Sequence, residues 1–211
     1  MIDKIIKNID INCQSSIRLA FSKIVYFDPY LLKTEPHDAD YIFITHPHYD
    51  HFSLEDIAKV ANDNTIIIAP SVVIKELPKK YNYEKINIGE EKNYGDFSVK
   101  IYPSYNINKQ FHPKEAGYVG YLLTIIDETY FIPGDSDVIP FYDTLKDLTV
   151  LFLPVGGTYT MTSKEASALA NQIKPKLAIP IHYGLAAGTI ADAEDFRNNL
   201  DDEITCHIFY K

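Results

Sequence analysis

Apolar residues along this chain gather into short runs separated by polar loops, which is the pattern of strands in a largely buried sheet. In the first third these runs predict strands over residues 9–21, with an interruption near Gln14, over 23–27 and over 40–45. Asp28-Pro29 ends the second of them. This part of the chain is therefore expected to be mostly β-structure.

Apolar residues first occur at helical spacing after residue 52, and from there predicted strands and helices alternate. Ser53 and Thr162, each followed three residues later by an acidic residue, predict capping boxes at the starts of two helices. Asp127-Glu128 is expected as the turn of a hairpin. The remaining predicted strands are 65–69, 86–88, 97–102, 118–126, 129–132, 149–153, 177–181 and 204–210. Three predicted helices begin at Ser53, Ser71 and Thr162, and a fourth spans 193–200.

This order of elements suits an α/β protein in which two sheets pack face to face with helices outside. No linker, low-complexity stretch or change of composition interrupts it, so a single domain over residues 1–211 is expected.

The composition narrows the class of partners. The formal net charge of −9, with no basic patch, argues against a nucleic-acid partner, so a small-molecule partner is expected instead. No apolar run reaches the length of a membrane span, and the N-terminus does not resemble a signal peptide. We therefore expect a cytoplasmic protein that does not enter a membrane; the pattern indicates no particular oligomeric state.

Potential metal ligands are concentrated in His46-Pro-His48-Tyr-Asp50-His51, directly after the apolar run 41–45. In extended backbone His46 and His48 leave the chain on the same side. Imidazole nitrogen and carboxylate oxygen are ligands of zinc, manganese and iron. A solvated polar loop is the alternative, but four ligands this close after a buried strand favour a metal site.

Three later loops also follow apolar runs. Asp135 lies in Pro133-Gly134-Asp135-Ser136-Asp137, and His182 follows the run 177–181. Taken alone, Asp135 reads as a turn aspartate and His182 as a structural histidine. Gly156-Gly157 would allow either a close approach of backbone to a ligand or a tight turn. Because ligands commonly lie on loops at strand ends, these loops are candidates to join the first cluster.

The motif His-x-His-x-Asp-His after a strand, then Gly-Asp, then a histidine at a strand end, resembles the metallo-β-lactamase superfamily. The resemblance extends from about Asn12 to Gly184. Several later segments, among them Phe111-His112-Pro113 and the glycine loop, look like the ascorbate-phosphate-lactonase-like branch of metal-dependent hydrolases. The resemblance implies a four-layer αββα sandwich with two divalent metal ions, zinc or manganese, at one edge of the sheets.

The resemblance also implies roles for individual residues. The Gly157 loop and Tyr159 would line the substrate pocket. Carried over by position, His46 and His48 bind the first ion, Asp50, His51 and His182 bind the second, and Asp135 bridges the two.

Two positions depart from the superfamily pattern. The first ion usually has a third histidine, and here Asn106 stands in its place. An amide oxygen is a poorer zinc ligand than imidazole, so the first ion would bind weakly, be another metal, or recruit His112. The second departure is Gln14, where relatives often have histidine.

The expected reaction is attack of a metal-bound hydroxide on a small ester, lactone or phosphoester. Asp50 is expected to orient the nucleophile and carry its proton, and Asn106 or Tyr159 to donate to the developing oxyanion. The alternatives are a phosphodiesterase or nuclease using the same chemistry, and a metal-stabilised binding protein without turnover. The presence of Asn106 favours the last of these.

Overall fold

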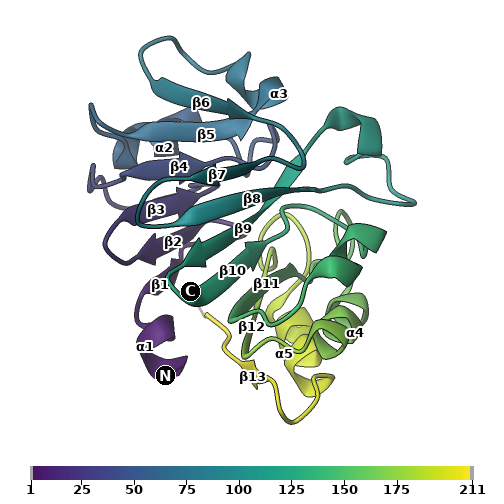
Figure 1. Cartoon of the computed structure of the whole chain (residues 1–211). Helices are drawn as coiled ribbons and strands as arrows, with labels where there is room; N and C mark the ends of the chain where they lie inside the picture. Colours follow the sequence, from purple (N-terminus) through teal and green to yellow (C-terminus); the bar gives the residue numbers. More distant parts are fainter. Residues whose placement is uncertain (1, 210–211) are drawn as a thin grey trace. The chain divides into compact units, whose positions relative to one another are not determined.

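The structure is a computed structural model that describes residues 2–209. The chain forms two compact units, Met1–Asn87 and Ile88–Lys211, and each unit contains its own sheet (Figure 1). The prediction of one domain over the whole chain stays a prediction.

The first unit contains a six-stranded sheet in which the strands follow one another in sequence order. The first three strands pair antiparallel, and from β3 onward the pairing is parallel. Its strands are β1 (Ile9–Ile11), β2 (Ile17–Ala20), β3 (Ile24–Phe27), β4 (Tyr41–Phe43), β5 (Ile66–Pro70) and β6 (Asn82–Ile86), and its helices are α1 (Ile2–Ile6), α2 (Leu54–Val60) and α3 (Ser71–Ile74).

Helices α2 and α3 pack against the sheet of this unit through apolar side chains. Ile57 and Val60 of α2 and Val73 of α3 share one buried cluster with Ile42 and Ile67 of the sheet. Helix α2 begins where the sequence predicts, because the Ser53 hydroxyl accepts the Asp56 backbone N–H, 3.2 Å away. The motif 46–51 therefore lies on the connection between a central parallel strand and a packed helix.

The second unit contains a seven-stranded sheet in the order β13-β12-β11-β10-β9-β8-β7. Strands β10 to β13 are parallel, whereas β7 to β10 pair antiparallel. Its strands are β7 (Glu91–Asn93), β8 (Ser98–Pro103), β9 (Val119–Ile125), β10 (Glu128–Ile132), β11 (Val150–Pro154), β12 (Leu177–Ile181) and β13 (Thr205–Cys206), and its helices are α4 (Ser163–Ile173), α5 (Ile190–Asn198) and the 3₁₀ turns Lys114–Ala116 and Pro140–Thr144.

Helices α4 and α5 cover this sheet from one face. Leu169 of α4 and Phe196 of α5 are buried in the same cluster as Leu151 and Ala178 of the strands. The capping box expected at Thr162 is present and opens α4. The parallel strands thus end at one edge of the sheet, where the loops that follow them carry polar residues.

Several element boundaries differ from the prediction. The strand expected at 86–88 lies earlier, as β6, and helix α5 begins three residues before residue 193. Ser71 is the first residue of α3, and Pro70 rather than Ser71 precedes the helix. The hairpin turn is Ile126-Asp127, because Ile125 pairs with Glu128. The last strand is Thr205–Cys206 instead of 204–210, of which residue 210 lies outside the described residues.

Within residues 2–209, no helix combines the length and the apolar character needed to cross a bilayer.

Candidate metal centre

In the first unit the parallel pairing of β3 and β4 brings their carboxyl ends to the same edge of the sheet. Asp28 directly follows β3, and Thr45 and the motif 46–51 follow β4. Thr45, His46, Asp50 and His51 are all buried. The alternative of a solvated polar loop would leave these side chains in water. Their burial therefore favours a metal site.

His46 and His48 aim one ring nitrogen each at a common point. His46 Nε2 and His48 Nδ1 are 3.1 Å apart. Two nitrogens bound to one tetrahedral zinc at ~2.0–2.1 Å would be separated by roughly 3.3 Å. The Thr45 hydroxyl lies 2.9 Å from His46 Nδ1, which orients the ring. The same-side placement predicted for the two histidines is confirmed.

Asp28 is a fully buried carboxylate that orients the motif. It accepts the Thr45 N–H (2.8 Å), the Thr45 hydroxyl (2.7 Å) and His51 Nδ1–H (2.7 Å). Burial raises the pKa of Asp28, while the hydrogen bonds from His51 and from the two Thr45 donors oppose that rise. With Nδ1 donating to the carboxylate, His51 carries its lone pair on Nε2, as metal-binding histidines do.

Asp50 lies on the Nε2 side of the same ring. Its Oδ2 is 3.7 Å from His51 Nε2, and its side chain is almost buried. A carboxylate and an imidazole nitrogen therefore face the same small space within the first unit.

In the second unit the parallel strands β10, β11 and β12 end at one edge, followed by Asp135, Gly156 and His182 respectively. Asp135 Oδ2 lies 3.1 Å from His182 Nε2 and 3.5 Å from His112 Nε2. All three side chains are buried. The structure thus brings Asp135 and His182 together, and it adds His112.

Asn106 and His112 are the two ends of a loop, and they are joined by two hydrogen bonds. Asn106 Oδ1 accepts His112 Nδ1–H at 2.8 Å, and the Asn106 backbone N–H donates to the His112 carbonyl at 2.7 Å. His112 Nε2 therefore carries a lone pair toward the Asp135 carboxylate. That arrangement is unfavourable without a cation or a proton between them, so this group of residues fits a bound metal ion.

The backbone near His182 is unusual. His182 has φ of +55°, a left-handed conformation that is uncommon for histidine. A Cβ at Gly156 would lie 2.6 Å from the His182 carbonyl oxygen. Of the two glycines of the loop, Gly156 is thus the one that allows β11 and β12 to place His182; Gly157, at φ +76°, makes the turn.

Tyr159 lies on the same side of the second unit as the His112 loop. Its ring packs edge-on against Phe111, with ring centroids 4.9 Å apart. Phe111 is half exposed. Tyr159 therefore contacts the neighbour of a candidate ligand.

A loop of the first unit, residues 30–32, also lies beside the motif. The Tyr30 ring meets the ring of Tyr49, which stands between His48 and Asp50. Burial raises the pKa of the Tyr30 phenol, and the nearby Tyr49 and Asp50 add to that rise.

Sequence reasoning missed Asp28, Gly156 as the close-contact glycine, and the pairing of Asn106 with His112. Asp28 follows an apolar strand, which is the signal that identified the other loops, but Asp-Pro also marks an ordinary turn. Gln14, which stands where relatives often have histidine, is buried with φ of +48°.

A model of the β-lactamase superfamily domain matches residues 17–182 of this chain. This match covers most of the chain and all six predicted ligands. The chain belongs to the β-lactamase superfamily.

Individual relatives agree with this membership. The chain is 30% identical over 190 residues to a UPF0173 metal-dependent hydrolase of Carboxydothermus hydrogenoformans, covering 82% of each protein. It is 32% identical over 193 residues to a UPF0173 metal-dependent hydrolase of Archaeoglobus fulgidus, covering 82% of this chain and 81% of the relative. A crystal structure of a protein from Parabacteroides distasonis superposes with a TM-score of 0.82 at 29% identity, over 95% of this chain and 91% of that one.

The mixed α/β class and the metallo-β-lactamase fold are thereby confirmed. The ascorbate-phosphate-lactonase-like branch stays a prediction.

Proposed function

We propose that this protein hydrolyses a small ester, lactone or phosphoester by means of a metal-bound hydroxide. Family membership and relatives named metal-dependent hydrolases support the coarser statement, that it is a metal-dependent hydrolase of the metallo-β-lactamase superfamily. The substrate class, two ions of zinc or manganese, a small-molecule partner and a cytoplasmic location are the finer parts of the proposal.

The observation that carries the proposal is the orientation of one histidine ring in each unit. His51 and His112 each donate Nδ1–H to a buried oxygen and turn Nε2 toward a carboxylate. This is the arrangement by which proteins prepare an imidazole for a metal ion. The donor set contains only imidazole and carboxylate groups, which suits zinc or manganese.

We further propose that the ligands of the two units bind the same pair of ions. The first ion is held by His46, His48 and, in place of the missing third histidine, His112. The second ion is held by Asp50, His51 and His182, and Asp135 bridges the two.

A pair of divalent ions would supply hydroxide at neutral pH and polarise the attacked oxygen. Asp28 and Asn106 hold His51 and His112 in the required tautomers. Asp50 orients the nucleophile and accepts its proton. Asn106 Nδ2 or the Tyr159 hydroxyl donates to the developing oxyanion.

The alternative of a metal-stabilised binding protein without turnover loses its main support. It rested on Asn106 as a weak replacement for a histidine ligand. The Asn106 oxygen instead accepts from His112, so the position supports an imidazole.

The test begins with protein that has been stripped of metal and reloaded with zinc or manganese. Metal content per chain is measured by mass spectrometry, and turnover is measured on an aryl ester, a five-membered lactone and an aryl phosphodiester. We expect two ions per chain and turnover of the ester or the lactone. Cleavage of the phosphodiester alone would favour the phosphodiesterase, and one ion without turnover would favour the binding protein.

The Asp50→Ala variant tests the role of the proton acceptor. We expect a loss of ~10²–10⁴-fold in kcat, the usual contribution of general acid–base catalysis. Metal content is measured on the same sample. A variant that keeps both ions and a near wild-type rate would contradict the assigned role.

A further inference from the structure

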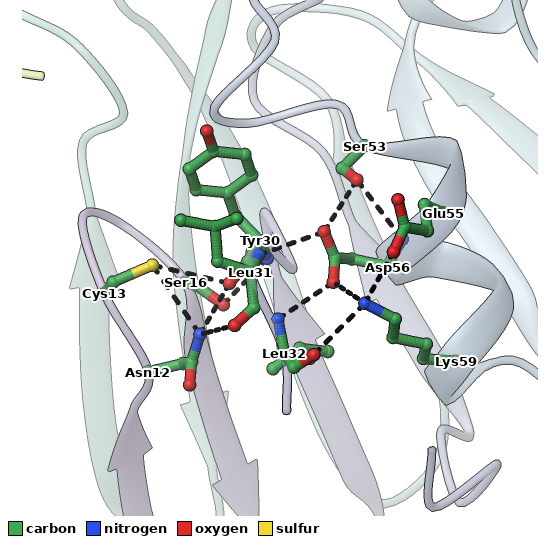
Figure 2. A network of polar contacts seen from close by, with 10 residues as sticks. All are labelled: Asn12, Cys13, Ser16, Tyr30, Leu31, Leu32, Ser53, Glu55, Asp56 and Lys59. Atoms are coloured by element: carbon green, nitrogen blue, oxygen red, sulfur yellow. Dashed lines mark hydrogen bonds and ion pairs between the residues drawn. The ribbon is translucent and has the colours of Figure 1, made fainter. Parts of the chain in front are cut away.

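The loop 30–32 is held by side chains from other parts of the first unit, at every one of its backbone polar groups (Figure 2). The three N–H groups and three carbonyls form no regular secondary structure, yet each has a partner. Ser16 Oγ accepts the N–H of Tyr30, the two Asp56 oxygens accept those of Leu31 and Leu32, Asn12 Nδ2 donates to the Tyr30 and Leu31 carbonyls, and Lys59 Nζ donates to the Leu32 carbonyl.

These contacts fix an unusual conformation. Leu31 has φ of +50°, which a leucine seldom adopts without constraint. Asp56 is only 3% exposed and accepts two backbone N–H groups besides the Ser53 hydroxyl. Strain of this kind persists only where the surroundings determine it, and it is concentrated at binding sites.

The constrained loop presents apolar side chains outward. Leu31 is 50% exposed and Tyr49 is 68% exposed. The Tyr30 and Tyr49 rings meet edge-on, with centroids 6.1 Å apart. In Figure 2 the Tyr30 ring points away from the hydrogen bonds that hold the loop.

Single exposed apolar residues are common and need no explanation. These three differ because they adjoin one another, because the loop is held rigidly, and because Tyr49 lies between two candidate ligands of the motif. A rigid apolar surface next to a reaction site lowers the entropy lost when a substrate binds.

We propose that Tyr30, Leu31 and Tyr49 form a wall on which the apolar part of the substrate rests. The preferred substrates then carry an alkyl or aromatic acyl group next to the scissile bond. This inference rests on the proposed hydrolase function and names the substrate class within it.

The test uses metal-loaded protein and p-nitrophenyl esters of acetate and octanoate. The Leu31→Asn/Tyr49→Ser double variant removes the apolar surface, and asparagine tolerates positive φ, so the backbone is retained. We expect the wild-type protein to prefer octanoate, and the ratio of kcat/KM for octanoate over acetate to fall by about 10-fold or more in the variant. Tyr83→Ser, at another exposed tyrosine, on β6, is the control and leaves the ratio unchanged.

A binding measurement separates this inference from the proposed activity. Octanoate and acetate share the same carboxylate, so their difference in affinity by calorimetry reports contact with the alkyl chain. Preferential binding of octanoate that the double variant loses supports the wall even if neither ester is turned over, in which case the proposed ester hydrolysis fails. Equal binding of both acids overturns the wall. So does a wild-type dimer, seen by sedimentation, that the double variant converts to monomers, because the surface would then be covered by a second copy.

Discussion

Three histidines of the candidate centre each have one ring nitrogen engaged by a group of their own unit. His46 faces the Thr45 hydroxyl, His51 donates to Asp28, and His112 donates to Asn106. The engaged nitrogen is Nδ1 in each case, so Nε2 carries the lone pair that a metal ion requires.

Asn106 offers a test of this arrangement at a residue that is not itself a ligand in our proposal. Asn106→Ala removes the acceptor for His112 Nδ1–H, and we expect affinity for zinc or manganese at one of the two sites to fall by about 10–100-fold. Affinity is measured by competition with a chromophoric chelator.

The matched variant is Asn106→Asp, which keeps an oxygen acceptor at the same place. It should retain most of the affinity that Asn106→Ala loses. If both variants bind metal as the wild-type protein does, His112 is not a ligand.

At the scale of elements, loops after parallel strands carry the candidate ligands of both units except His112, whose loop follows the antiparallel strand β8. Strands β3 and β4 in one sheet, and β10, β11 and β12 in the other, each end next to a loop with a buried polar residue. A close backbone contact fixes the loop that carries His182, so a residue without any chemistry of its own helps to determine where that ligand lies.

Gly156 is such a residue. Any side chain there would collide with the His182 carbonyl, and the Ala187 Cβ lies 3.1 Å from the position of the added carbon. We expect Gly156→Ala to destabilise the protein by roughly 1–3 kcal/mol through overpacking, and to weaken metal binding because His182 must shift. Urea unfolding and metal titration check the two effects.

The control is Gly184→Ala, at a glycine of the following loop whose added Cβ would meet nothing within 4 Å. Its φ of +91° strains any side chain, so some loss of stability is expected there too. Metal affinity should change in Gly156→Ala alone, and an equal change in both variants would contradict the argument.

Asp56 links helix α2 to the loop 30–32, and its carboxyl group makes the stability of the protein depend on pH. Burial alone would raise its pKa, but hydrogen bonds from Ser53, Leu32, Lys59 and Leu31 lower it below the ordinary value of 3.8. A carboxyl whose folded pKa is lowered stabilises the protein above the unfolded pKa, and this contribution is lost as the pH falls through the folded pKa.

We therefore expect Asp56→Asn to lower the free energy of unfolding by about 1–3 kcal/mol near neutral pH. The gap between variant and wild type should narrow below pH ~4. Chemical unfolding at several pH values measures the gap. Glu55→Gln, at an exposed neighbour, is the control; a gap for Asp56→Asn that is constant with pH would contradict the prediction.

The sequence predicts elements well where local patterns determine them. Apolar runs locate β4 and β12, and the Thr162 capping box locates α4. Strand β7, Glu91–Asn93, was not predicted because all three of its residues are polar. Asp28 and His51 are 23 residues apart, and the hydrogen bond between them depends on the parallel pairing of β3 with β4, which no local pattern reveals.

At the scale of the whole molecule, the proposal requires ligands from both units to bind the same ions. A ligand that binds only the folded protein stabilises it by about 2.7 kcal/mol at a concentration 100 times its dissociation constant. Removal of metal with a chelator should therefore lower Tm, and restoring zinc or manganese should raise it again.

Single ligand variants make this prediction specific to shared ions. His48 belongs to the first unit and His182 to the second. If the ions are shared, His48→Ala and His182→Ala should each reduce the metal-induced rise in Tm, and each should lower metal content below two ions per chain. The control is His37→Ala, at an exposed histidine away from the motif, which should respond to metal as the wild-type protein does. Two ions retained in either ligand variant, with the full rise in Tm, would show that the replaced histidine does not bind them.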